Sequence, residues 1–456
     1  MLELASLSNR HRDLAERDAE RVFGWRFDPR IVLDRGEGVS VFDVDGNQYI
    51  DLSAGMMCMV LGHSHPELTE VIREQAGTFV HESSWFTNPW AVEFAERIAS
   101  TLPDGLEVVN FAVTGSEANE IAMRMAIAYT GNHDVVSVLR GLHGGSLGVE
   151  AVTSVGGERK GGLGPLMIPA RTNAVLAPFC YHCPVNLQYP ECDIDCLRLS
   201  EDMVEHMSSK SIAAFMTETI MVPGGMIVPP DEWLPRMKAM AERWGALLVV
   251  DEAQLAPGRT GSIWAFEQYD VVPDIVTFAK GMSAGFSVCG TVTTKEIAEK
   301  VRGELGLPWA GTYSGDPLSS AVALKSLDIV LRDRLHEAAA EKGRYLRERL
   351  DELRMRYECI GDVRGRGLYQ MLDIVESKES RRPDYAMAER IRYNTVLHGL
   401  LAICVKNYMR ISPPLIVTLE EIDELVGRLE QSIQAALDGH PRDLDFSTSS
   451  SLAASR

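Results

Sequence analysis

Residues 247–254 read LLVVDEAQ, and residues 273–281 read PDIVTFAKG. Each stretch is a short, largely apolar run that ends in a charged side chain, Asp251 in the first and Lys280 in the second. Short runs of this kind are typical of strands buried on both faces of a parallel sheet. Because such sheets bind ligands beyond the carboxyl ends of their strands, the two side chains are expected at a binding site.

The same pattern extends through the middle of the chain. Strands are predicted at residues 108–112, 134–139, 213–217, 247–250 and 275–278, and helices at residues 117–130, 233–244 and 319–332. Strands that alternate with helical segments predict an α/β fold, in which helices cover a parallel sheet.

Both ends of the chain differ from this middle part. Residues 39–52 predict a hairpin that turns at Asp45-Gly46, and from residue 335 a helix, a strand-like segment (359–375) and two more helices follow, the last at 419–437. We therefore expect a large domain over residues 64–332. A smaller domain is expected from residues 1–63 and 333–437, and the Ser-rich tail at 438–456 is expected to be disordered.

The composition limits the possible partners. The chain has 456 residues, a formal net charge of −20 and a pI near 5.0, which argues against nucleic acid and anionic membranes as partners. No apolar run approaches the roughly 20 residues of a membrane helix, and the charged N-terminus does not resemble a signal peptide. The eight cysteines are scattered along the chain, which favours a cytoplasmic location.

A third strand end has the form of a phosphate site. The stretch VVNFAVTGSEAN (108–119) leads through Thr114, Gly115 and Ser116 directly into a helix. Small residues let the backbone approach an anion, and the first amides of the helix point toward it. The same three residues are also an ordinary helix N-cap sequence, so the signal is weak by itself.

Asp251 and Lys280 each have a functional and a structural interpretation. A buried carboxylate needs a partner, and a protonated pyridine nitrogen would be one; an N-cap or an ion pair is the alternative. A lysine that closes an apolar strand is desolvated, which suits Schiff-base chemistry, although it could also extend its amine to solvent. The phosphate site, the aspartate and the lysine together favour a pyridoxal 5'-phosphate (PLP) site.

With these residues and several motifs, the chain resembles the class III (subgroup II) PLP-dependent aminotransferases, and its pattern is most similar to dialkylglycine decarboxylase. The resemblance covers residues 27–437. It rests on GxxxxxLGHxHPE (55–67), TGSEANExAxRxA (114–126), HGG (143–145), LLVVDEAQ…GRTG (247–261), PDIVTFAKG (273–281), YSGDPLSSA (313–321), VRGRGL (363–368) and RISPPL (410–415). It implies fold type I, with a mainly parallel seven-stranded sheet in the large domain and a smaller α+β domain from both chain ends.

The resemblance also implies a role for each matching residue. Lys280 would carry the cofactor as a Schiff base and move the proton, and Asp251 would pair with the pyridinium. The other implied cofactor-binding residues are Thr114, Gly115, Ser116, Leu142, His143, Glu218, Gln254 and Thr312. Thr312 matches a threonine that reaches the phosphate of the neighbouring subunit, which implies a homodimer with shared active sites and leaves a tetramer open. Arg410 would bind the substrate carboxylate with its planar donor fork.

Departures from the family pattern bear on the substrate. Leu142 replaces an aromatic residue that stacks on the cofactor, so we expect aliphatic contact there or stacking by His143. Pro223 replaces the glutamate that masks the arginine in dual-specificity members. Met56 replaces a glutamine that holds the departing carboxylate in the decarboxylase, and methionine cannot donate that hydrogen bond. Met56 and Trp85 are expected to line the substrate pocket, although methionines more often fill a core.

Four cysteines, Cys180, Cys183, Cys192 and Cys196, have spacings that invite a zinc interpretation. Similar loops recur in the family without a catalytic metal, so we expect no metal; zinc, free thiols and a labile disulfide are the alternatives. The leading function is transamination between a donor with an α-carboxylate and a keto acid such as pyruvate. A decarboxylating transaminase of the dialkylglycine type, an amino-acid racemase or epimerase, and a non-catalytic PLP-binding module are the other possibilities.

Overall fold

The computed structural model describes residues 7–24, 28, 31–155, 174–305 and 311–439. The predicted disordered tail lies outside the described residues from position 440 onward. The chain forms two compact units. The first comprises Met1–His65, Lys342–Val363 and Leu368–Arg456, and the second comprises Pro66–Glu341 with Arg364–Gly367.

The second unit is built on a seven-stranded sheet in the order β4-β10-β9-β8-β7-β5-β6. β10 is antiparallel to both of its neighbours, and the other pairs are parallel. The predicted α/β fold with a mainly parallel seven-stranded sheet is therefore confirmed. The strands are β4 (Val108–Ala112), β5 (Asp134–Val138), β6 (Ala174–Val175), β7 (Ile212–Glu218), β8 (Leu247–Asp251), β9 (Ile275–Phe278) and β10 (Cys289–Thr293).

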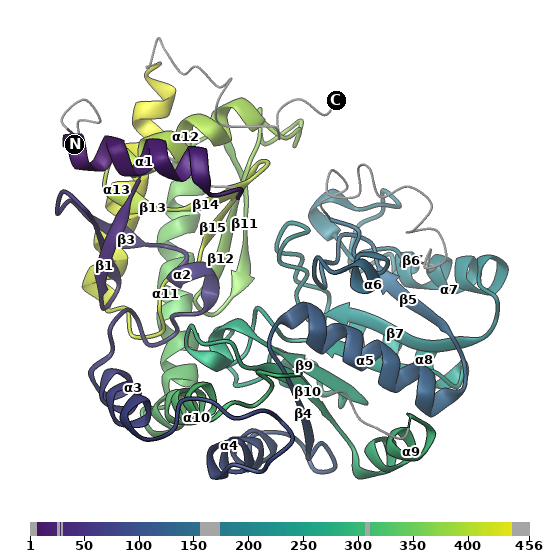
Figure 1. The fold of residues 1–456 in the computed structure, drawn as a ribbon. Coiled ribbons are helices and arrows are strands. Elements are labelled where there is room, and N and C mark those ends of the chain that lie inside the picture. Colours follow the sequence, from purple (N-terminus) through teal and green to yellow (C-terminus); the bar gives the residue numbers. More distant parts are fainter. Residues whose placement is uncertain (1–6, 25–27, 29–30, 156–173, 306–310, 440–456) are drawn as a thin grey trace. The chain divides into compact units, whose positions relative to one another are not determined.

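Helices cover this sheet (Figure 1). α5 packs on β7 to β10, where its small residues Ala122 and Ala126 meet Ala214 and Val249 and let the helix lie close to the strands. The helices of this unit are α3 (Pro66–Thr78), α4 (Pro89–Ala99), α5 (Gly115–Thr130), α6 (Leu147–Glu150), α7 (Asp195–Met207), α8 (Trp233–Arg243), α9 (Lys295–Leu305) and α10 (Pro317–Arg332), with 3₁₀ turns η4 (Cys180–His182), η5 (Ala265–Tyr269) and η6 (Lys280–Ser283).

The first unit contains two four-stranded sheets, β1-β2-β3-β13 and β11-β12-β15-β14. The predicted hairpin is present, because β2 pairs antiparallel with β3 and Gly46 turns at φ +85°. The predicted strand-like segment 359–375 is two strands, since Gly367 adopts φ +55° and interrupts it. The elements wholly in this unit are α1 (Asn9–Arg21), β1 (Leu33–Glu37), β2 (Ser40–Asp43), β3 (Gln48–Asp51), α2 (Ala54–Met57), β12 (Tyr369–Ile374), α12 (Tyr385–Leu397), β13 (Leu400–Leu401), β14 (Ile403–Val405), β15 (Tyr408–Ile411) and α13 (Leu419–Leu437). Two more, α11 (Leu335–Arg356) and β11 (Ile360–Arg366), have residues in both units.

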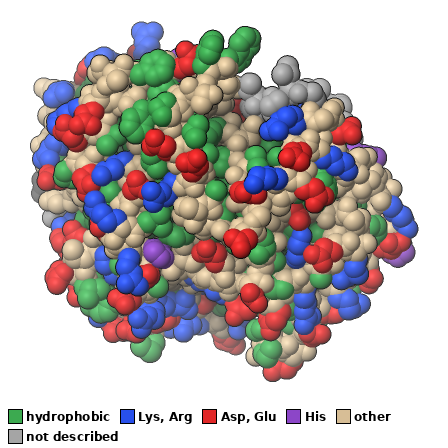
Figure 2. Space-filling model, turned by 90° about the horizontal axis from the view of Figure 1, so that it is seen from below, with side chains coloured by type: hydrophobic (Ala, Val, Ile, Leu, Met, Phe, Trp, Pro, Cys, Tyr) green, Lys and Arg blue, Asp and Glu red, His purple; other side chains and the backbone are tan. Residues whose placement is uncertain are grey.

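Charged side chains of both signs share the surface. On the face drawn in Figure 2, lysine and arginine side chains are interspersed with aspartate and glutamate. Among the described residues, no helix combines the length and apolarity needed to cross a membrane.

Candidate active site

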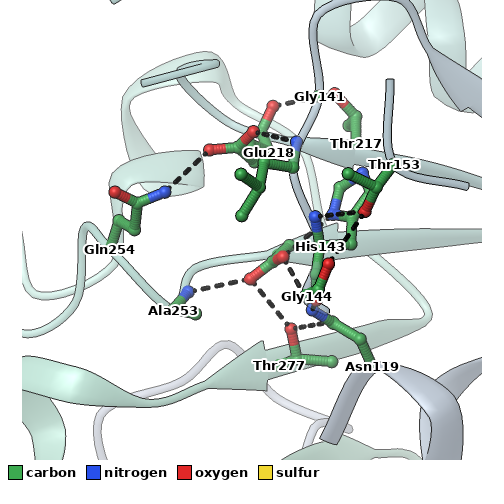
Figure 3. Close-up of polar contacts among 12 residues, drawn as sticks. Asn119, Gly141, His143, Gly144, Thr153, Thr217, Glu218, Ala253, Gln254 and Thr277 are labelled. Carbon is green, nitrogen blue, oxygen red and sulfur yellow. Dashed lines mark hydrogen bonds and ion pairs between the residues drawn. The ribbon is translucent and has the colours of Figure 1, made fainter. Parts of the chain in front are cut away.

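Asp251 is the last residue of β8, a strand whose residues are all buried. Its Oδ2 atom accepts hydrogen bonds from the His143 ring Nδ1 (2.9 Å) and the Asn119 amide Nδ2 (2.8 Å). Its Oδ1 atom accepts from the Ala253 backbone N–H (3.0 Å) and lies 3.2 Å from the Thr277 hydroxyl (Figure 3). Three N–H donors therefore surround one buried carboxylate, with the Thr277 hydroxyl beside them.

These donors determine the charge of Asp251. Burial raises its pKa, but the hydrogen bond and charge of His143, the Ala253 amide and the charge of Lys280 outweigh that effect, so the net shift of the pKa is downward. A carboxylate that stays ionised at 4% exposure is a strong local negative charge.

Glu218 lies beside Asp251, because it ends β7 and the two residues are paired in the sheet register. Its carboxyl group accepts the backbone N–H groups of Leu142 (3.0 Å) and Val222 (3.3 Å) and the side-chain amide of Gln254 (3.4 Å). Burial, followed by the charge of Asp251, raises the pKa of Glu218 well above its usual range. Burial and the charge of Asp251 thus shift the pKa of Glu218 upward, whereas the pKa of Asp251 is shifted downward, so the two adjacent carboxyls differ in how readily they ionise.

Lys280 follows β9 and begins the 3₁₀ turn η6. The charge of Lys280 acts to lower the pKa of Asp251 and partly offsets the upward shift of the pKa of Glu218. The three groups are therefore within electrostatic reach of one another. Its backbone adopts φ +43°, a left-handed conformation that is unusual for a residue with a side chain. Such outliers persist where the surrounding structure imposes them and are frequent at functional sites.

The predicted phosphate site is the N-terminus of α5. Thr114 is the N-cap, and it forms a capping box in which its hydroxyl accepts from the Glu117 N–H (3.2 Å) and the Glu117 carboxylate accepts from the Thr114 N–H (3.3 Å). The first-turn amides of Gly115 and Ser116 have no intrahelical acceptor. A Cβ at Gly115 would lie 3.3 Å from the Cβ of Ala279, so this turn packs directly beside the residue that precedes Lys280.

The segment 143–145 packs against this helix end. The Ser116 hydroxyl accepts from the Gly145 N–H (3.1 Å). Gly144 adopts φ +147°, and a Cβ there would lie 2.4 Å from the Ser116 Oγ and 2.7 Å from the Val149 Cγ1. Only glycine fits at position 144. The close approach of this segment to α5 lets His143 bond to Asp251 while Gly145 bonds to Ser116.

Four other predicted residues have no hydrogen bond to Asp251 among those described above. Thr312 is exposed in the loop before α10, and Trp85 is 83% exposed; both belong to the second unit. Arg410 and Met56 belong to the first unit. Arg410 is buried in β15, and its Nε has no hydrogen-bond partner in the part of the chain that the structure describes. Met56 is 43% exposed and adopts φ +59°.

Sequence reasoning missed two residues of this network, Asn119 and Thr277. The Asn119 side chain also donates to the His143 carbonyl (2.6 Å) and accepts from the Thr277 hydroxyl (2.7 Å). A signal was available in both cases. Asn119 is a polar residue on the buried side of α5, next to Ala118, and Thr277 is a polar residue within the apolar strand β9. Buried polar side chains of this kind need partners.

These residues fit PLP. A buried carboxylate that stays ionised suits a protonated ring nitrogen. The free first-turn amides of α5 and the glycine at position 144 suit a phosphate group. Lys280 is within electrostatic reach of Asp251, as a lysine that binds the cofactor must be.

Known proteins agree with this geometry. Residues 25–433 match the family model for class III aminotransferases. Human mitochondrial alanine–glyoxylate aminotransferase 2 is 32% identical over 420 residues, 87% of this chain and 80% of that protein. A leucine/methionine racemase from Thermococcus litoralis is 30% identical over 418 residues, 91% of this chain and 93% of that protein.

A solved structure extends the agreement to the fold. The (S)-enantioselective omega-transaminase from Thermomicrobium roseum has a TM-score of 0.88 and 32% sequence identity, over 95% of this chain and 100% of that one. The chain is an enzyme of fold type I and belongs to the class III aminotransferases, which are PLP-dependent transaminases.

Proposed function

We propose that Lys280 holds the cofactor covalently and moves the proton while an amino group passes from a donor with an α-carboxylate to a keto acid. When bound, PLP supplies a ring that accepts the electron pair released at the substrate Cα. Asp251 keeps the ring nitrogen protonated, and the Gly115 and Ser116 amides bind the phosphate. The observation that carries this proposal is the buried Asp251 at the end of β8, which accepts hydrogen bonds from His143 and Asn119 and whose pKa is lowered in part by the charge of Lys280.

Several neighbours orient these groups. Gln254 and the Leu142 N–H donate to Glu218 and hold its carboxyl group beside Asp251. The His143 ring is fully buried and bonded to Asp251. Because the His143 ring is held by this hydrogen bond, we propose that Leu142 makes an aliphatic contact with the face of the cofactor and that His143 does not stack on it.

Attachment is tested by borohydride reduction of the holoenzyme followed by peptide mapping. We expect the reduced cofactor on the peptide that contains TFAKGM. Lys280→Ala should abolish the label, whereas Lys238→Ala should not, because Lys238 is paired with Asp274 (2.7 Å) away from the site. A label on Lys210 or Lys238 would overturn the assignment.

The substrate carboxylate is assigned to Arg410. Its buried Nε lacks a partner among the described residues, and a buried guanidinium is costly unless an anion pairs with it. Because the human relative is named for alanine and glyoxylate, we propose alanine as a donor with glyoxylate as the acceptor, and pyruvate as the acceptor for other amino donors. A panel of amino donors and keto acids, followed by conversion of the cofactor to its amine form, tests this choice.

Two other outcomes are tested in the same experiment. The VRGRGL and RISPPL motifs favour decarboxylation, and the racemase relative favours racemisation. Met56 cannot donate a hydrogen bond to hold a departing carboxylate, so we propose that proton transfer from the substrate Cα is favoured over loss of CO₂. Single-turnover reactions with alanine and 2-aminoisobutyrate should form the amine cofactor without CO₂. Fast CO₂ release from 2-aminoisobutyrate, or loss of optical rotation without amine cofactor, would reverse this ranking.

We also propose a homodimer in the cytoplasm, with Thr312 reaching the phosphate site of the partner. Trp85 and Phe86 are 83% and 69% exposed, and large exposed aromatic side chains are typical of interfaces. The residue before Trp85 contacts the residue before Thr312, since the Ser84 hydroxyl donates to the Gly311 carbonyl (3.3 Å). Light scattering should give a dimer or a tetramer, and Thr312→Ala should weaken cofactor binding; a fully active monomer would contradict both.

A further inference from the structure

The loop between β6 and α7 contains three of the eight cysteines, and a fourth, Cys196, lies in the first turn of α7. Cys180, Cys183, Cys192 and Cys196 all line one small pocket that is partly open to solvent. All four are free thiols. Within the described ranges no three His, Cys, Asp or Glu side chains are placed to hold a metal ion, so the cavity offers thiols without a preformed metal site.

Two of these thiols are positioned by a 3₁₀ turn. η4 spans Cys180–His182 and Cys183 is its C-cap, so the two cysteines are three residues apart across one turn. In a 3₁₀ helix the side chains at positions i and i+3 eclipse, and a rise of about 2.0 Å per residue separates their Cα atoms by about 6 Å. Disulfides need a Cα separation of about 4.4–6.8 Å, and the spacing of an ideal turn of this kind falls within that range.

Accessibility and hydrogen bonding distinguish the two thiols. Cys180 is exposed, whereas Cys183 is partly covered and its sulfur accepts the Leu187 N–H (3.4 Å). An exposed thiol followed by a covered one suits attack from solvent and then closure within the chain.

We propose that Cys180 and Cys183 are a redox-active pair that converts reversibly to a disulfide by exchange with a low-molecular-weight disulfide. The Cys180 thiolate attacks one sulfur of the reagent and releases one thiolate. The Cys183 thiolate then attacks the Cys180 sulfur and releases the second. Two protein thiols and one reagent disulfide thus become one protein disulfide and two reagent thiols, which take up the two protons.

The electrostatics of the cavity set the rate of this exchange. Burial, and then the charges of Cys192 and Cys183, raise the pKa of the Cys180 thiol. Less thiolate is therefore present at neutral pH, and exchange should accelerate as the pH rises. A thiolate that the protein does not stabilise also favours the disulfide over the reduced pair.

The test uses the holoenzyme and oxidised glutathione at pH 7.5 and 8.5, with alkylation of free thiols and mass spectrometry of non-reduced peptides. We expect the peptide that carries Cys180 and Cys183 to lose two hydrogens, several-fold faster at pH 8.5, and to recover them with dithiothreitol. Cys183→Ser should stop at a glutathione adduct on Cys180, and Cys180→Ser should block the reaction.

Cys192→Ser is the matched control, because Cys192 lines the same cavity outside the turn, and it should still form the pair. A Cys180–Cys192 link, a stable glutathione adduct in the wild type, or no reaction would overturn the proposal. Stoichiometric Zn²⁺ binding that is lost in Cys192→Ser would also overturn it in favour of a metal site. None of these readouts depends on amino transfer, so this test is independent of the proposed function.

Discussion

Replacing Asp251 by Asn removes one charge and one acceptor from a carboxylate that accepts hydrogen bonds from three N–H donors. If the new amide oxygen faces the Ala253 N–H, its NH₂ group meets two donors, the His143 Nδ1 and the Asn119 Nδ2. His143 can change tautomer only by moving its proton to Nε2, which has no partner among the described residues. Asn119 can flip only by turning its oxygen toward the His143 carbonyl.

Each arrangement therefore leaves at least one buried polar group unsatisfied. Hydrogen bonds to a charged group contribute about 1.5–3 kcal/mol, and an unsatisfied buried donor costs about 1–3 kcal/mol. We expect the free energy of unfolding of the cofactor-free protein to fall by about 2–4 kcal/mol. Loss of the charge that keeps the ring nitrogen protonated should raise the barrier by about 4 kcal/mol or more, roughly a thousandfold in rate.

Two assays separate these effects. Urea unfolding of the cofactor-free protein measures stability, and a single-turnover half-reaction with alanine measures the rate. Asp270→Asn is the matched control, because Asp270 is an exposed aspartate of the same unit and should change neither quantity. An Asp251→Asn variant with wild-type stability and more than a tenth of wild-type turnover would refute the assigned role.

Three further changes have defined outcomes. Gly144→Ala places a Cβ 2.4 Å from the Ser116 Oγ at φ +147°, so cofactor affinity measured by dialysis should fall at least tenfold and stability by about 2 kcal/mol; normal affinity would contradict the close packing. Burial raises the pKa of Glu252 from 4.5 to about 7, so the folded state binds the proton more tightly and stability falls as the pH rises from 4.5 to 7. The difference in unfolding free energy between wild type and Glu252→Gln should therefore change by about 3 kcal/mol across that window, and a constant difference would exclude this titration. Arg410→Lys keeps the charge but loses the planar fork, so binding of α-amino acids should weaken by roughly 1.5–3 kcal/mol while simple amines are little affected; equal losses would mean another role for Arg410.

Local patterns in the sequence predicted much of this molecule. The β4 and β9 strands have the predicted bounds, β5 and β8 differ by one residue at one end, and β7 is one residue longer at each end, because runs of β-branched and apolar residues are a local signal. Asp251 and Lys280 were singled out for the same reason, since a charged residue at the end of an apolar run is conspicuous. The motifs around them were sufficient to indicate the family, which the comparisons confirmed.

Only the tertiary structure brought distant residues together. Asn119 and Asp251 are 132 positions apart, and they meet because α5 packs on β8 and β9; no local pattern encodes that contact. The opposite pKa shifts of Glu218 and Asp251 likewise depend on the pairing of β7 with β8 and on burial of both carboxyls. A pKa is set by neighbouring charges and by desolvation, and both are properties of the packed structure rather than of the residue type.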